Sequence, residues 1–258
     1  MKPQLANDEI YHVILRAVGD AKIFNDENDY YRGIFSIYEF NNAKPVSIWL
    51  RRQQRKSEKT RESALRCPTS TPLVQPFLYS KGVSMSDTAT TKMGDERDKL
   101  VEVLVFCFMP NHIHLLLKQV KDNGITNFMK KVGGGYANYF NKKYQRKGHL
   151  FNKFKSIHVA DDDQLKTAFA YIHTNPLSFI EPGFKEKGIR DIDKAVKFLE
   201  EEYRWSSFFD FIDKPNFASV TDRDFISEII GGAGGSKKSI TDWIKYKKKI
   251  NNLPTDYL

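Results

Sequence analysis

Residues 99–120 form the pattern that most restricts what this chain can fold into. The stretch KLVEVLVFCFM, residues 99–109, is nearly all apolar, which predicts a central strand of a sheet. Pro110 and Asn111 follow as a tight turn, and HIHLLLKQV, residues 112–120, returns antiparallel to the first strand. The sequence therefore predicts an antiparallel sheet that includes this hairpin.

Two histidines begin the second strand of the hairpin. Side chains alternate along a strand, so His112, His114 and Leu116 are expected on one face of the sheet and the intervening apolar residues on the other. Imidazole is a common metal ligand, so the pair is a candidate metal site. The simpler interpretation, two polar side chains on a solvated sheet face, is still open at this point.

Patterns on both sides of the hairpin predict the rest of a small sheet. Residues 10–18 are rich in β-branched side chains and predict a strand, and apolar residues at helical spacing predict a helix at 26–41. A long apolar stripe predicts a second helix within 123–147, and a loop with a further strand covers 149–160. A helix with an acidic first turn follows at 161–176 and is stopped by a proline.

The order strand, helix, strand, strand, helix, strand, helix fits an α+β fold. We expect the ferredoxin-like arrangement, a four-stranded antiparallel sheet with helices on one face. Gly133, Gly134 and Gly135 interrupt the second helix at a cost of about 1 kcal/mol each relative to alanine, so we expect a kink there or the close approach of another group. Residues 185–258 add helices and a glycine-rich break at 231–236.

The chain is basic, with 41 Lys and Arg residues, 32 Asp and Glu residues and a net charge of +9. Between residues 118 and 158, ten basic residues stand against one acid, Asp122, so this window carries 10 − 1 = +9. Aromatic residues are interleaved with these cations, which favours a nucleic-acid surface because cations meet phosphates and rings stack on unpaired bases. The alternative is a solvated helix whose rings face the core. The predicted DNA contacts are Arg16, Lys130, Lys131, Lys142, Lys143, Arg146, Lys147, Lys153 and Lys155.

The helix at 161–176 offers the groups that a metal site at the histidines would still lack. Tyr171 and Asn175 are four residues apart and share one helix face. An amide oxygen suits a hard cation such as Mg²⁺ or Mn²⁺, and a phenol beside such an ion is a candidate nucleophile. His173 lies on a different face and is not expected to be a ligand. Equally, Tyr171 could pack against the sheet and Asn175 could cap the helix.

Several motifs resemble those of one enzyme family. FMPNHIHLLLK, YANYFNKKYQRKGHLF and AYIHTNP are similar, in this order, to the signatures of HUH-superfamily single-tyrosine transposases. The most similar branch is the REP-associated tyrosine transposases, relatives of the small insertion-sequence transposases. YHVILRAVGDAKIFNDENDYYR at the start and YRWSSFFDF after the core also resemble the family, so the likeness covers about 10–42 and 99–211.

The resemblance implies a ferredoxin-like fold and a DNA transposase, a metal-dependent endonuclease and strand transferase that acts on single-stranded DNA near hairpins. By this likeness His112 and His114 match the metal-binding pair, Asn175 the third ligand, and Tyr171 the nucleophile that becomes joined to the DNA 5′ phosphate. A 3′ hydroxyl then attacks the phosphotyrosine and rejoins the strands. The implied cofactor is Mg²⁺ or Mn²⁺. Tyrosines in the middle helix, Tyr136, Tyr139 and Tyr144, are interpreted as packing or DNA contacts.

Two departures from the family pattern affect the expected substrate. NKF stands at 152–154 where the family commonly has a glutamine-glycine-arginine run, so a basic DNA contact is expected at Lys153 or Lys155 instead. Residues 43–98 enlarge a normally short connection. Two other functions stay open: a hairpin nucleic-acid-binding protein that does not cleave, descended from a transposase, and a metal-dependent phosphoesterase that uses water.

The expected organisation is a catalytic domain over 1–212 and a C-terminal helical extension over 213–258. Residues 43–98, rich in Ser, Thr, Pro and basic residues, are expected to be a flexible insertion. The sequence has neither a transmembrane pattern nor a signal-peptide pattern, and its two cysteines do not suggest disulfides. It predicts a cytoplasmic protein without membrane contacts, a monomer or homodimer, that binds single-stranded DNA with hairpin structure.

Overall fold

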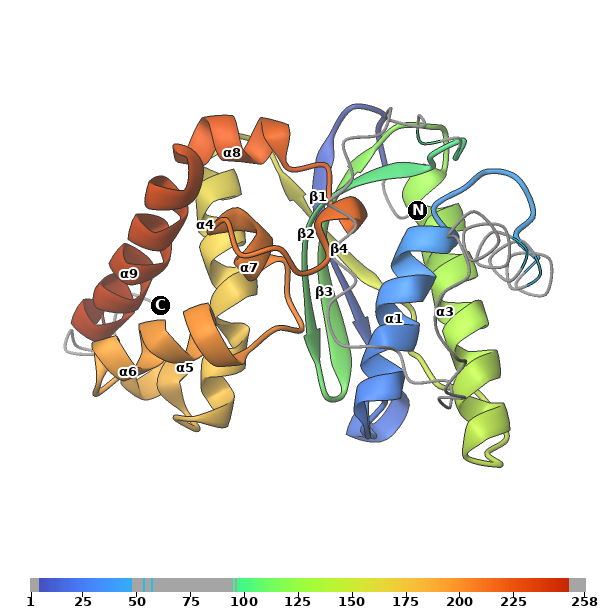
Figure 1. Ribbon diagram of the computed structural model, residues 1–258, viewed down its shortest axis with the longest axis horizontal. Coiled ribbons are helices and arrows are strands. Elements are labelled where there is room, and N and C mark those ends of the chain that lie inside the picture. Colours follow the sequence, from blue (N-terminus) through green and yellow to red (C-terminus); the bar gives the residue numbers. More distant parts are fainter. Residues whose placement is uncertain (1–4, 48–52, 54–56, 58–94, 96, 251–258) are drawn as a thin grey trace, which may run out of the picture.

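The computed structural model describes residues 5–47, 53, 57, 95 and 97–250 (Figure 1). The predicted insertion at 43–98 lies largely outside these residues. Its two ends meet: the backbone N–H of Ala43 donates to the carbonyl oxygen of Asp98 at 2.7 Å. The chain therefore leaves the described part and returns to it at nearly one point.

Four antiparallel strands form the sheet, in the spatial order β2-β3-β1-β4. The strands are β1 (Ile10–Arg16), β2 (Val101–Met109), β3 (His112–Gln119) and β4 (Lys155–Val159). The central pair, β1 and β3, places Arg16 opposite His112 and His12 opposite Leu116. This order and this pairing confirm the predicted ferredoxin-like sheet and the hairpin at residues 99–120, but β2 is an edge strand of the sheet and not the central strand that its apolar sequence predicted.

One face of the sheet is covered by helices α1 (Glu27–Glu39) and α3 (Gly124–Lys143), as Figure 1 shows. Alternate apolar side chains of the strands, such as Val13 and Leu115, pack there with Ile37 and Phe128 of the helices. Helix α1 begins after Asp26, whose side chain accepts a hydrogen bond from the backbone N–H of Asp29 at 3.0 Å, an ordinary N-terminal cap.

The second face of the sheet is also covered, which differs from the predicted helices on one face. Helix α4 (Asp162–Thr174) and the elements after it lie on this side (Figure 1). The reason is that β2 and β3 are apolar on both faces: Leu104, Cys107 and Leu116 join Phe169 in a second core. The later helices are α5 (Phe184–Lys187), α6 (Ile192–Lys197), α7 (Phe208–Phe211), α8 (Asp224–Ile230) and α9 (Gly232–Ile250). Short turns of helix are Val18–Asp20, Asn175–Phe179, Phe198–Glu202 and Ala218–Val220.

Helix α3 runs through its three glycines, so the prediction of a kink is wrong and the prediction of close approach is right for one of them. A Cβ on Gly135 would lie 2.2 Å from Cε2 of Phe40, a buried ring that follows α1. A Cβ on Gly134 would meet nothing within 4 Å. Gly135 therefore lets α3 pack closely against the end of α1, because only a residue without a Cβ fits there.

The glycine-rich segment 231–236 is mostly helical, contrary to the predicted break. Only its first two residues depart from helical geometry: Gly231 has φ of 90° and Gly232 has φ of 66°, values that glycine adopts without strain. Helix α8 ends at this point and α9 begins. Ile240 and Ile244 of α9 belong to the same core as Phe169 of α4. The division into domains at residue 212 stays a prediction.

The motif YRWSSFFDF lies along the outer edge of β2. The backbone N–H of Phe108 donates to the carbonyl of Trp205 at 2.9 Å, and the N–H of Ser207 donates to the carbonyl of Phe106 at 3.0 Å. The Ser207 hydroxyl also accepts from the backbone N–H of Phe106 at 3.1 Å. These contacts satisfy backbone groups that an edge strand would otherwise expose.

Candidate active site

Three histidines lie together on the face of the sheet that carries α4. His112 and His114 come from β3, and His12 comes from the neighbouring strand β1. Nε2 of His112 is 3.0 Å from Nε2 of His114, and Nε2 of His12 is 2.9 Å from Nδ1 of His114. The rings of His12 and His114 are stacked with centroids 5.1 Å apart. The alternation predicted from the sequence therefore places both histidines of β3 on one face, together with a third.

Each histidine of β3 has a partner for its Nδ1 atom. Nδ1 of His112 is 2.6 Å from Oδ1 of Asn111, a residue of the hairpin turn. Asn111 accepts through this oxygen, so Nδ1 of His112 carries the proton and Nε2 keeps its lone pair. The same tautomer of His114 donates from Nδ1 to Nε2 of His12. In this arrangement the Nε2 atoms of His112 and His114, 3.0 Å apart, both keep their lone pairs, as in metal-binding histidines whose second nitrogen is fixed by a hydrogen bond.

Burial favours the neutral form of two of these histidines, His12 and His114. His12 is 6% exposed and His114 is 3% exposed. Burial lowers the pKa of His12 to about 4. Burial, together with the nearby His112 and His12, lowers the pKa of His114 well below its usual value of 6.5. Neutral imidazole is the form that binds metal ions, so His114 is in the ligand form at neutral pH.

Tyr171 reaches the histidines from helix α4. Asp161 caps this helix by accepting from the backbone N–H of Gln164 at 2.7 Å, and the apolar side of the helix, including Phe169 and Ile172, packs into the second core. Tyr171 is half-buried, and the centroid of its ring is 5.8 Å from those of both His12 and His114. The structure thus brings the predicted nucleophile to the predicted histidine pair.

Asn175 follows the last residue of helix α4 and caps the helix, one of the two roles considered for it. Its Nδ2 donates to the carbonyl oxygen of Tyr171 at 2.8 Å, so the amide does cap the helix. Its Oδ1 is held on the other side, where Nζ of Lys185 donates to it at 2.8 Å. The same ammonium lies 3.4 Å from the hydroxyl oxygen of Tyr171. The side chain of Asn175 is therefore linked to Tyr171 twice. Its Nδ2 donates to the backbone carbonyl of Tyr171, and its Oδ1 shares the ammonium of Lys185 with the tyrosine hydroxyl.

The donor set is compatible with one hard divalent ion. Two nitrogens bound at right angles to an ion at about 2.1 Å lie about 3.0 Å apart, which is the separation of the two Nε2 atoms. Among the described residues, no three His, Cys, Asp or Glu side chains are arranged to hold a metal. The Oδ1 atom of Asn175 is an amide oxygen, a type of ligand that hard cations accept.

His173 lies away from this group, as predicted. Its ring is fully buried among Phe169, Phe208 and Phe211, and its Nε2 is 2.9 Å from the Ser207 hydroxyl. Burial lowers the pKa of His173 to about 3. Its surroundings are those of a neutral core histidine.

Comparison with known proteins supports one family. Residues 87–175 match the sequence model of the family described as "Transposase IS200 like". This region resembles the IS200-like transposases. The match spans about a third of the chain and includes His112, His114, Tyr171 and Asn175. No curated protein and no solved structure was found to match the chain.

The match confirms the resemblance to the HUH-superfamily single-tyrosine transposases, while the REP-associated branch stays a prediction. The family supports a transposase function, and with it DNA binding and DNA transposition and recombination. In the part of the chain that the structure describes, no helix has both the length and the apolar character needed to cross a bilayer.

The predicted DNA-contacting residues have different surroundings in the structure. Some are engaged within the protein. Lys131 donates to the carbonyl oxygens of Ala43 and Lys44 at 3.2 and 2.9 Å, and Arg146 donates to that of His149 at 3.0 Å. Lys143 pairs with the carboxylates of Asp26 and Asp29. The contacts of Lys131 and Lys143 hold α3 to its neighbours, and that of Arg146 lies within the segment after α3, so all three residues have structural roles.

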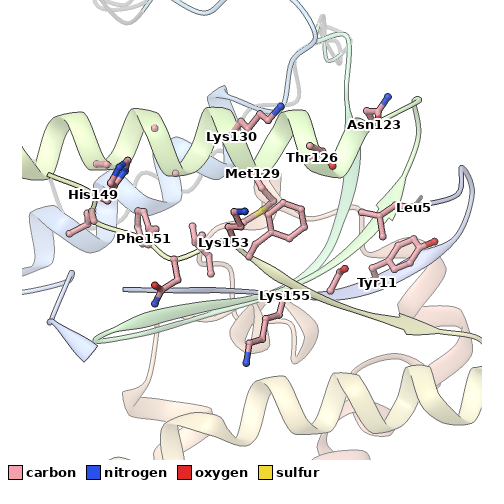
Figure 2. Close-up of a pocket in the computed structure, with 18 of the residues that line it drawn as sticks. Leu5, Tyr11, Asn123, Thr126, Met129, Lys130, His149, Phe151, Lys153 and Lys155 are labelled. Carbon is pink, nitrogen blue, oxygen red and sulfur yellow. The ribbon is translucent and has the colours of Figure 1, made fainter. Parts of the chain in front are cut away.

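Two other members flank the histidines. Arg16 lies opposite His112 in the register of β1 and β3, and Lys155 lies opposite Ile14 in the register of β1 and β4. Residues directly opposite in antiparallel strands point to the same face, so both are on the face of the sheet with His114. Figure 2 shows Lys155 extending from β4 to the side away from α3. The arrangement gives the site a basic border toward β4.

A groove lies on the other face of the sheet, between α3 and the segment that leads into β4 (Figure 2). Its volume is about 1120 Å³. Apolar side chains such as Met129 and Phe151 line it, and Lys130 and Lys153 add positive charge. Because the groove opens on the face opposite the histidines, it is separate from the active-site candidates. Lys142 and Lys147 are exposed at the end of α3 and after it.

The tyrosines of α3 pack within the protein, one of the two roles predicted for them. The hydroxyl of Tyr136 donates to the carbonyl oxygen of Ile23, and burial raises the pKa of Tyr136. The hydroxyls of Tyr139 and Tyr144 donate to Asp29 at 3.0 and 2.7 Å. None of these three hydroxyls is directed at the histidines.

Sequence reasoning missed two residues of the site. His12 stands in the first predicted strand, and alternation along that strand places it on the same face as Arg16, which was a usable signal. Lys185 had no comparable signal, because its place depends on the chain turning back after α4. Asn111 was assigned only to the turn, and its contact with His112 follows from that turn.

Proposed function

We propose that this protein cleaves and rejoins single-stranded DNA near hairpins, with Tyr171 as the nucleophile and a divalent cation, Mg²⁺ or Mn²⁺, as the cofactor. The observation that carries the proposal is the convergence of the Nε2 atoms of His112 and His114, 3.0 Å apart, beside the ring of Tyr171. In a pair of solvated histidines, water can satisfy the Nδ1 atoms, so neither ring needs a protein partner there. Here both have one.

His112, His114 and Asn175 would hold the cation. When bound, it would polarise the scissile phosphate as a Lewis acid. His12 and Asn111 would keep the two imidazoles in the tautomer that leaves Nε2 free. The backbone of helix α4 would fix the distance between the tyrosine and Asn175, since the Nδ2 atom of Asn175 is bound to the Tyr171 carbonyl.

The chemical step at Tyr171 is a transesterification. The phenol oxygen bonds to phosphorus and loses its proton, while the bond from phosphorus to the 3′ oxygen breaks and that oxygen takes up a proton. The products are a 5′-phosphotyrosine and a free 3′ hydroxyl. Rejoining is the reverse step, in which a 3′ hydroxyl attacks the phosphotyrosine and Tyr171 leaves. Neither step consumes a nucleotide cofactor.

The DNA strand would cross the histidine face of the sheet. Arg16 and Lys155 lie on that face and would meet phosphates on the side toward β4. On the opposite face, the groove with Lys130 and Lys153 offers apolar surface and positive charge, as single-stranded nucleic acid requires. Exposed Lys142 and Lys147 would extend the electrostatic attraction.

The test is a denaturing gel of the protein with hairpin-containing single-stranded DNAs, each labelled at its 5′ or its 3′ end. A 5′-phosphotyrosine predicts that only the 3′-labelled fragment moves to the size of the protein. The band should require Mg²⁺ or Mn²⁺ and disappear in Tyr171→Phe. Tyr246→Phe is the matched control, because Tyr246 is 54% exposed on α9.

Two results would change the assignment. Cleavage that survives Tyr171→Phe and leaves no adduct would identify a phosphoesterase that uses water. Metal-independent binding without cleavage of any tested hairpin would identify a nucleic-acid-binding protein that does not cut.

A further inference from the structure

Lys185 enters the candidate active site from a segment outside the matched region. It lies on the short helix α5, ten residues after Asn175. The neighbouring Phe184 is 5% exposed and packs into the second core, which fixes the position of this helix. Lys185 is an exposed residue, and its ammonium group reaches Tyr171 and Asn175.

The ammonium group contacts the two residues with proposed chemistry on α4. Nζ lies 2.8 Å from Oδ1 of Asn175, 3.4 Å from the hydroxyl oxygen of Tyr171, and 5.1 Å from the centroid of the tyrosine ring. The contact at 3.4 Å is long for a hydrogen bond, so the ammonium is close to the phenol without being fixed on it. The lysine stem has several rotatable bonds and can turn between these partners.

A phosphate that reacts with Tyr171 must come within bonding distance of the tyrosine oxygen. Its non-bridging oxygens would then lie within a few ångströms of Nζ of Lys185. Negative charge develops on these oxygens and on the entering phenol oxygen during the transfer. A positive group held at that place stabilises the transition state more than the ground state.

We propose that Lys185 is a catalytic contact of the reacting phosphate, a protein cation that acts beside the divalent ion. The inference rests on the proposed function of Tyr171. It adds a residue that the histidine and tyrosine motifs do not contain. The competing explanation is that Lys185 only orients the amide of Asn175, in which case its loss would act through metal binding.

The experiment compares Lys185→Gln, Lys185→Arg and the control Lys187→Gln, which changes an exposed lysine of the same helix. Two quantities are measured for each. The first is the single-turnover rate of adduct formation with 3′-labelled hairpin DNA at saturating Mn²⁺. The second is the Kd for Mn²⁺ without DNA, by calorimetry, with Asn175→Ala as the reference for a lost ligand.

We expect Lys185→Gln to slow adduct formation about 100- to 1,000-fold, as loss of one group that stabilises transition-state charge does. Lys185→Arg should recover part of the rate, and Lys187→Gln should match the unaltered protein. The Kd for Mn²⁺ in Lys185→Gln should be unchanged or lower, because a positive charge next to Asn175 has been removed.

Three results would overturn the inference. If Lys185→Gln forms adduct within about twofold of the unaltered protein while Tyr171→Phe forms none, the proposed function stands and Lys185 has no catalytic part. If the Kd for Mn²⁺ rises as much as the rate falls, Lys185 only positions Asn175. If the unaltered protein forms no adduct with any hairpin, the proposed function fails and this inference fails with it.

Discussion

His12 and His114 stack across adjacent strands, with Nε2 of His12 2.9 Å from Nδ1 of His114. Residues that orient a metal-binding histidine affect metal affinity by about 10- to 100-fold. We therefore predict that His12→Ala raises the Kd for Mn²⁺ by this factor, because the ring of His114 loses its partner. Calorimetry gives the Kd, and thermal unfolding shows whether the fold is kept. His158→Ala, an exposed histidine on β4, should leave the Kd unchanged. An unaltered Kd in His12→Ala would contradict this role.

Alanine substitutions at the adjacent Gly134 and Gly135 of α3 should have opposite effects on stability. Gly134→Ala adds a methyl group in open space and should stabilise the protein by about 0.5–1 kcal/mol, the difference in helix propensity. Gly135→Ala should destabilise it by about 1–2 kcal/mol, since the new Cβ would overlap the buried ring of Phe40. The free energy of unfolding in urea measures both. Equal effects of the two substitutions would show that α3 can shift away from Phe40.

The buried His173 predicts a loss of stability in acid. The pKa of His173 is about 3 in the folded protein, lowered by burial, against 6.5 as the ordinary value. Between these values the unfolded chain binds the proton and the folded protein does not, so stability falls as the pH is lowered from about 6.5 toward 3. The slope is about 1.4 kcal/mol per pH unit for one group.

The measurement for this prediction is the free energy of unfolding at pH 7, 6 and 5. His173→Gln should flatten the decline relative to the unaltered protein, whereas His149→Gln, at an exposed histidine, should not. His12, with a pKa of about 4, contributes a decline of the same sign. An identical slope in His173→Gln would exclude a neutral buried state for this residue.

The carboxylate of Asp29, on α1, accepts hydrogen bonds from side chains at the end of α3. Burial alone would raise the pKa of this carboxyl, but hydrogen bonds from Lys143, Tyr144, the backbone of Asn25 and Tyr139 outweigh it and lower the pKa. Asp29→Asn should destabilise the protein by about 2 kcal/mol, because the ammonium and the hydroxyls lose a charged acceptor. Chemical denaturation checks this. The control Asp163→Asn, at a side chain 98% exposed, should change stability by less than about 0.5 kcal/mol.

The elements around the site could be predicted because their signals are local. Alternation in β3 fixed the common face of His112 and His114, and helical spacing fixed the common face of Tyr171 and Asn175. That these two faces meet required the family resemblance, since no local pattern records which face of the sheet α4 covers.

The rest of the site depends on distant pairing. His12 and His114 are 102 residues apart, and their contact exists only because β1 and β3 pair in one register. Lys185 reaches the site because the chain turns back after α4, and the burial of the neighbouring Phe184 sets the direction of this turn. The expectation of helices on one face was wrong because the apolar residues of β2 belong to two cores, one on each face of the sheet.

The hydrogen bond between Ala43 and Asp98 has a consequence for the evolution of the chain. The two ends of the segment between them are held side by side by this contact. Each doubling of such a closed length costs only about 0.6 kcal/mol in entropy. Segments of very different length can therefore be exchanged between these two residues while the face of the sheet with the histidines keeps its shape, which makes this point a natural place for the chain to gain or lose sequence.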